Sequence, residues 1–149
     1  YHMNNDLFLT KTGGMFVTAI LGHYNTITDE ISWVNGGHQP ALLRDKNGNF
    51  EQVESAAPPM GVIQQKNKSL YKINRTKLNG KRFYAFTDGL SESLDSKGNE
   101  IGIEGSIKII EKNFNDDVSK QLSNIAKDVE KSSGKNKLSD DLTLIAIGK

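Results

Sequence analysis

The chain has 149 residues, 36% of them hydrophobic, and is long enough to bury the core of one globular domain. Nineteen Lys and Arg against eighteen Asp and Glu give a formal net charge of +1, which argues against a nucleic-acid or membrane-surface binder, since both usually carry a basic excess. Cysteine is absent, which excludes disulfides and thiolate metal sites and favours a reducing compartment such as the cytoplasm.

The first residues are expected to lie outside the domain proper. Residues 1–13 open with YHM, which resembles a cloning remnant, so His2 and Met3 are given no functional role. The following NNDLFLTKTGG looks like the tail of a helix and a linker. We therefore expect residues 14–149 to form the C-terminal portion of a domain whose earlier residues lie upstream.

The sequence of the first two-thirds of the chain predicts β-strands. Runs of β-branched and aromatic residues, or of alternating apolar and polar residues, predict strands at 15–25, 30–37, 40–45, 50–54, 69–76 and 79–87. The turn-like TITD predicts an antiparallel hairpin between the first two, and the Asn47-Gly48 pair predicts a second hairpin. Two prolines and a glycine make 55–62 a loop.

The sequence of the last third of the chain predicts two helices and a final strand. Apolar residues at helical spacing predict helices at 104–114 and 116–134, the second capped by Asp116 or Asp117. LTLIAIGK (142–149) predicts a final strand. Many antiparallel strands followed by two helices and a strand indicate an α+β fold in a single domain.

Acidic residues stand at the ends of two predicted strands. Asp88 ends one strand, and Asp140 and Asp141 precede another, so antiparallel pairing of the two would bring the acids to one sheet edge. Gathered carboxylates repel one another and favour a bound cation, for which magnesium and manganese are suited. Gly89 would allow a sharp turn there. An ordinary turn and a solvated loop explain the same residues, and spacing alone favours that structural interpretation.

Other candidates have simple structural explanations. His38 lies in the glycine turn NGGHQP, where a histidine is more often a structural hydrogen-bonding residue. DKNGN (45–49) and DSKGNE (95–100) superficially resemble calcium loops but lack the Gly and Glu positions of such loops, so both are predicted to be turns. The residues after Gly89, SES at 91–93, would either line a site or begin a helix.

Four segments in order resemble the bacterial metal-dependent serine/threonine phosphatases of the phosphatase 2C-like superfamily. They are GGMFVTAILGHYNTITDEISWVNGGHQPALL, PPMGV, YAFTDGLSES and SDDLTLIAI, and they extend from Gly14 to Ile147. The chain is most similar to the branch of the sporulation stage II protein E and the stress-response sigma-factor regulators. This resemblance implies an α+β fold, in which a β-sandwich of antiparallel strands with flanking helices holds two divalent cations, manganese or magnesium.

The resemblance also implies roles for individual residues. Asp88 and Asp140 would be catalytic metal ligands, with Gly89 contributing beside them, while Asp141 and His38 would be neighbours of the site. The two ions would activate a bridging water that attacks phosphoserine or phosphothreonine in line, without a phosphoenzyme. The implied partner is a phosphorylated regulatory protein, such as an anti-sigma-factor antagonist, rather than nucleic acid or a membrane.

One family feature is missing from these residues. The family's central bridging Asp lies in a Gly-Asp segment near the start of the domain, and nothing before Gly13 supplies it, since Asp6 has no preceding Gly. We therefore expect missing N-terminal strands, an incomplete metal site, an inactive fragment, and exposed sheet edges that favour a homodimer or strand exchange. The alternative is a non-catalytic pseudophosphatase or protein-binding module on the same fold.

Overall fold

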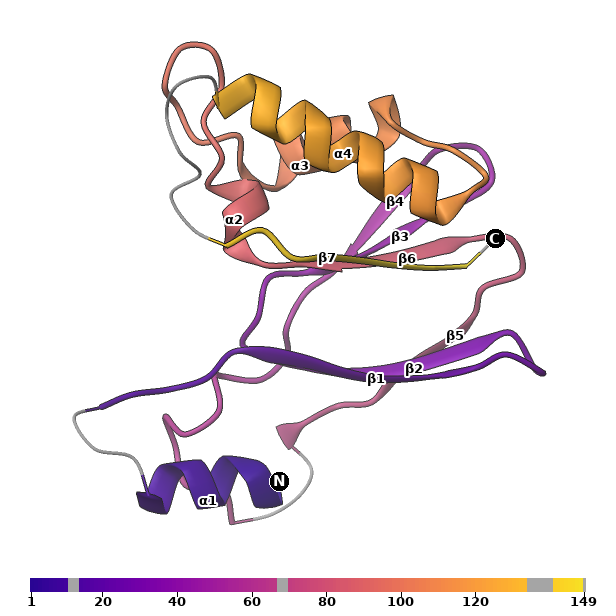
Figure 1. Ribbon diagram of the computed structural model, residues 1–149. Coiled ribbons are helices and arrows are strands. Elements are labelled where there is room, and N and C mark those ends of the chain that lie inside the picture. The colour runs from indigo at the N-terminus through magenta and orange to yellow at the C-terminus, as the bar shows by residue number, and fades with distance from the viewer. Residues whose placement is uncertain (11–13, 67–69, 134–140, 149) are drawn as a thin grey trace. The chain divides into compact units, whose positions relative to one another are not determined.

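The computed structural model describes residues 1–10, 14–66, 70–133 and 141–148. The single domain expected from the sequence divides into two compact units, each formed by two stretches of the chain (Figure 1). The first unit comprises Tyr1–Ala41 and Gln52–Asn79, and the second comprises Leu42–Glu51 and Gly80–Lys149. None of the helices in the described stretches is both long and apolar enough to cross a membrane.

The first unit contains a helix and a three-stranded antiparallel sheet. The helix is α1 (His2–Thr10), and the sheet has the order β1-β2-β5, with β1 at Ala19–Asn25, β2 at Glu30–Gly36 and β5 at Asn74–Lys77. The hairpin predicted between the first two strands is confirmed, with Ala19 opposite Gly36 and Asn25 opposite Glu30.

The strand predicted at 69–76 was wrong in its extent. Among its described residues, the strand is formed by Asn74–Lys77, which pair with the first four residues of β2. Tyr71 instead directs its hydroxyl to the Asn4 side chain, 2.9 Å away. An alternating pattern therefore marked a partly buried segment correctly, but the length of the strand depended on its partner.

Helix α1 is tied to the first unit by two asparagines. The buried Asn4 accepts hydrogen bonds from the Gly61 backbone N–H at 3.0 Å and from Tyr71. Asn5 donates to the Gln65 carbonyl at 3.0 Å and accepts from the Gln65 N–H at 2.8 Å. These side chains satisfy backbone groups of Gly61 in the predicted loop and of Gln65 just after it.

The second unit packs three helices on a four-stranded sheet. The sheet has the order β4-β3-β6-β7, with β3 at Ala41–Arg44, β4 at Phe50–Val53, β6 at Arg82–Phe86 and β7 at Leu144–Gly148. Its residues belong to the second unit except Ala41 and the last two residues of β4, at which the first unit ends and resumes. The helices are α2 (Asp88–Ser91), α3 (Gly102–Lys112) and α4 (Val118–Ser133), and they lie on one side of this sheet (Figure 1). The two long helices and the last strand confirm the predicted elements, and Asp117 caps α4 by accepting the Lys120 N–H at 3.1 Å.

The core of the second unit joins strands to helices. Its buried side chains are Leu42, Tyr84, Phe86, Leu90, Ile110, Ile125 and Val129, all at most 3% exposed. Burying a large aliphatic or aromatic side chain contributes about 1.5–3 kcal/mol. This shared apolar core therefore holds α2, α3 and α4 against β6 and its neighbours.

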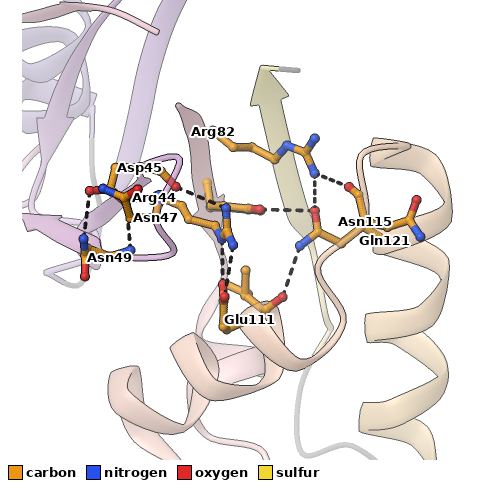
Figure 2. Close-up of polar contacts among 10 residues, drawn as sticks. Arg44, Asp45, Asn47, Asn49, Arg82, Glu111, Asn115 and Gln121 are labelled. Atoms are coloured by element: carbon orange, nitrogen blue, oxygen red, sulfur yellow. Dashed lines mark hydrogen bonds and ion pairs between the residues drawn. The ribbon is translucent and has the colours of Figure 1, made fainter. Parts of the chain in front are cut away.

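A buried guanidinium organises the connection between α3 and α4. Arg82 is 1% exposed, and its terminal nitrogens donate to the Asn115 carbonyl at 2.6 Å and the Gln121 side-chain carbonyl at 2.7 Å (Figure 2). A further hydrogen bond reaches the Asp116 carbonyl at 3.1 Å. Burial raises the pKa of Tyr84, so its hydroxyl stays protonated and donates to Gln121 at 3.1 Å. Since arginine is always charged, its burial is tolerated only because these acceptors replace water.

A second arginine reinforces the same region. Arg44 on β3 makes two hydrogen bonds to the Glu111 carboxylate, at 2.6 and 3.0 Å (Figure 2), and these raise the pKa of Arg44. Its guanidinium lies 3.6 Å from the centroid of the Phe114 ring, and that of Arg82 lies 4.9 Å from the same ring. The end of α3 is therefore held by two cations and one aromatic ring.

Replacing Arg82 tests this organisation. Arg82→Ala should lower the free energy of unfolding by about 3 kcal/mol, because the buried Gln121 side chain and two partly buried carbonyls lose their donor. The matched control is Arg75→Ala. The Arg75 side chain is 65% exposed and forms a long ion pair with Glu30, at 3.5 Å. Its replacement should therefore change the free energy of unfolding by less than about 0.5 kcal/mol. Equal effects of the two substitutions in urea unfolding would contradict the structural role of Arg82.

The contact between α3 and α4 should depend on pH. Asp128 on α4 accepts hydrogen bonds from Lys112 at 2.8 Å and Asn113 at 3.0 Å, and these hold the pKa of Asp128 below its ordinary value. The stabilisation is therefore fully present above the unfolded pKa of about 3.9 and is lost as the pH falls through the folded value.

Asp128→Asn should accordingly destabilise the protein at pH 7, by less than about 1 kcal/mol, and the difference from the unchanged protein should shrink below pH ~4. Glu130→Gln, at an exposed position on the same helix, is the control and should show no such difference. Urea unfolding at a series of pH values measures both, and a pH-independent effect of Asp128→Asn would contradict the assignment.

Candidate metal centre

The pairing of β6 with β7 brings the predicted acidic segments together. The two strands are antiparallel, and five residue pairs join them, from Arg82 opposite Gly148 to Phe86 opposite Leu144. The residues that follow β6 therefore lie beside those that precede β7. The prediction that Asp88 and Asp141 share one edge of the sheet is confirmed, whereas Asp140 lies outside the described residues.

Asp88 is the first residue of α2 and has an exposed side chain. The extended backbone of Thr87, with φ −76° and ψ 164°, turns the chain from the strand into this short helix. The Asp88 carbonyl accepts the Glu92 N–H at 2.7 Å, so the backbone of Asp88 serves the helix. Asp88 is therefore an exposed acid directly after Thr87, which is hydrogen-bonded to the segment before β7.

Gly89 does not form the sharp turn expected from the sequence. It is buried as the second residue of α2, and its carbonyl accepts the Ser93 hydroxyl at 2.7 Å. The next residue, Leu90, is fully buried in the core of the second unit. The chain continues as a helical turn here because that conformation places Leu90 in the core, while the role of Gly89 beside a metal stays a prediction.

Thr87 is the residue at this edge that the sequence analysis did not identify. Its hydroxyl donates to the Asp141 carbonyl at 2.9 Å and accepts the Thr143 N–H at 2.9 Å. Its own backbone N–H donates to the Thr143 carbonyl at 3.0 Å. The only signal in the sequence was that a hydroxyl residue directly precedes the Asp-Gly pair. Its hydrogen-bond partners could not be identified before the pairing of the two strands was known.

The donors at this edge fit a divalent cation in kind. Asp88 and Asp141 present exposed carboxylates from adjacent chain segments, and such oxygens are the ligands that magnesium and manganese prefer. Over the described ranges, however, no group of three or more His, Asp or Glu residues is placed to hold a metal ion. The two acids therefore provide part of a ligand set that further oxygen donors would have to complete.

His38 belongs to the first unit, in the turn after β2. Its Nδ1 lies 3.1 Å from the Thr18 hydroxyl, and its backbone N–H donates to the Asn35 side chain at 2.8 Å. Gly37 in this turn has a φ of 69°, and a Cβ there would clash with Pro59. These contacts support the structural explanation of the turn, and a role of His38 near the metal site stays a prediction.

The two loops that superficially resemble calcium sites are turns, as predicted. One carboxylate oxygen of Asp45 accepts the N–H groups of Asn47 and Asn49, at 2.8 and 2.9 Å. Asp95 makes the equivalent bonds to Lys97 and Asn99, at 2.8 and 3.0 Å. Hydrogen bonds from Asn49 and from Asn99 lower the pKa values of Asp45 and Asp95 respectively. Both carboxylates therefore stabilise their own loops.

The chain matches the model of a protein family over its whole length. The model of the family "Stage II sporulation protein E (SpoIIE)" matches residues 1–149. The chain belongs to the SpoIIE family. Among curated proteins, Protein IcfG of Synechocystis sp. is 24% identical over 115 residues, which are 75% of this chain and 18% of IcfG.

Solved structures show the same fold for this SpoIIE-family chain. The SiaA-PP2C domain of Pseudomonas aeruginosa has a TM-score of 0.73 at 14% identity, covering 89% of this chain and 51% of that one. The manganese-soaked phosphatase domain of SpoIIE from Bacillus subtilis has a TM-score of 0.66 at 14% identity, covering 97% and 61%. The predicted α+β, phosphatase 2C-like fold class is confirmed, and the chain spans about half the length of the SiaA domain and less than a fifth of IcfG.

Proposed function

We propose that this chain is part of a metal-dependent protein phosphatase that hydrolyses phosphoserine or phosphothreonine on a regulatory protein. The observation that carries the proposal is the edge formed by β6 and β7, where Asp88 follows one strand and Asp141 precedes the other. In a chain of the SpoIIE family with a phosphatase 2C-like fold, an exposed pair of acids at paired strand ends is suited to bind cations.

The proposed site uses Asp88 and Asp140 as ligands of manganese or magnesium. When bound, these cations supply Lewis-acid activation of water and neutralise charge on the phosphoryl oxygens. Asp88 contributes a carboxylate whose backbone is fixed in α2, and Asp141 adds negative charge beside it. The manganese-soaked SpoIIE domain supports the choice of metal. A complete pair of ions requires ligands beyond the acids described at this edge.

The proposed substrate is a small phosphorylated regulator, such as an anti-sigma-factor antagonist. The related SpoIIE of Bacillus subtilis is a cell fate determinant, which supports a regulatory partner. A net charge of +1 favours such a protein over nucleic acid, and we propose a cytoplasmic location from the lack of cysteine. Self-association through a sheet edge stays a prediction, supported by Leu21 on β1 and Ile145 on β7, which are 52% and 51% exposed.

Hydrolysis of p-nitrophenyl phosphate by the full-length protein tests the proposed function. Activity should require manganese or magnesium, and Asp88→Asn or Asp140→Asn should each lower kcat/KM by about 100-fold or more, because each removes a charge that holds the cations. Asp45→Asn is the matched control, since its carboxylate is occupied within its own turn, and it should retain activity.

The same assay decides between the proposal and the alternative of a non-catalytic binding module. Metal-independent turnover, or full activity of Asp88→Asn, would contradict the assignment of the site. A full-length protein without any turnover would favour the binding module on the same fold.

A further inference from the structure

The contact between β6 and β7 continues beyond their last residue pair through Thr87. The ladder ends at Phe86 opposite Leu144, yet three hydrogen bonds join Thr87 to the segment before β7. Two involve the hydroxyl, with the Asp141 carbonyl and the Thr143 N–H both at 2.9 Å, and one involves the Thr87 N–H and the Thr143 carbonyl at 3.0 Å. Together they fix the chain on both sides of Leu142.

The chemistry at this position requires a hydroxyl. One oxygen here donates a hydrogen bond and accepts another at the same time, which the side chain of serine or threonine does in so small a space. Valine has the shape of threonine but can do neither. A substitution that removes only these two bonds, without creating a cavity, is therefore available at this residue.

The location of the bonds links them to the candidate metal centre. Thr87 directly precedes Asp88 in the chain, and the carbonyl that it binds belongs to Asp141. The hydrogen bond between Thr87 and Asp141 fixes these two backbone positions against each other. It therefore limits how far Asp88, which follows Thr87, can move away from Asp141.

We propose that Thr87 is a positioning residue of the cation site, holding the segment before β7 against the start of α2 so that Asp88 and Asp141 stay at one edge of the sheet. This inference rests on the proposed function. Partners that orient metal ligands in this way typically contribute about 10- to 100-fold in metal affinity.

A purely structural role would have a different signature. Asp88, Asp141 and Thr143 are exposed and Thr87 is half-buried, so little apolar surface depends on this contact. Five residue pairs and the buried core already join β6 to β7. Loss of the hydroxyl should therefore clearly weaken metal binding, while the temperature of unfolding should stay nearly unchanged.

Titration calorimetry of manganese binding to the full-length protein tests the inference. Thr87→Val should weaken binding by about tenfold or more, whereas Thr87→Ser, which keeps the hydroxyl, should stay within about twofold of the unchanged protein. Thr143→Val is the matched control, because the bonds described here use the backbone of Thr143, and it should bind normally. The melting temperature of Thr87→Val should fall by no more than about 4 °C.

Each other outcome would overturn the inference in a recognisable way. Equal manganese affinity of Thr87→Val and the unchanged protein would remove the positioning role, and equal loss in Thr87→Ser and Thr87→Val would show that the hydroxyl is not responsible. If Asp88→Asn abolishes binding while Thr87→Val does not, the proposed function stands and this inference fails. A lack of manganese binding by the unchanged protein would overturn both.

Discussion

The antiparallel pairing of β6 with β7 is the constraint on which the candidate site depends. Phe86 and Leu144 face each other although their residue numbers differ by 58, so a large loop must close before the acids can meet. Loop closure is entropically unfavourable. Burial of Tyr84 and Phe86 in the core shared with α3 and α4 offsets this cost. The chemistry proposed at the sheet edge therefore rests on packing in the interior of the second unit.

The two ends of β6 have different tasks. At its first residue, the buried Arg82 binds the connection between α3 and α4 through backbone and side-chain carbonyls. Just beyond its last residue, Thr87 binds the segment before β7, and Asp88 presents its carboxylate. One short strand thus couples the helical layer to the candidate metal centre. This arrangement explains how a site on exposed chain segments can be held in place.

Sequence patterns identified most of the helices and strands, because periodicity and turn residues act locally. They identified the shared edge because antiparallel pairing brings the end of one strand beside the start of its partner. They did not identify Thr87, whose partners at 141 and 143 exist only after the strands pair. They also suggested a glycine turn at Gly89, where burial of Leu90 favours a helical turn instead. The strand at 74–77 was placed too early for the same reason, since its limits are set by β2. In each case a tertiary contact decided between local alternatives.

Anomalous X-ray diffraction from crystals of the full-length protein grown with manganese tests the central claim most directly. We expect an anomalous peak within about 2–2.5 Å of an Asp88 carboxylate oxygen, at the edge formed by β6 and β7. The loops of Asp45 and Asp95 should show no peak, because hydrogen bonds within each loop engage their carboxylates. Ordered manganese elsewhere in the protein, with Asp88 bound to none of it, would show that Asp88 is not a ligand of the cation.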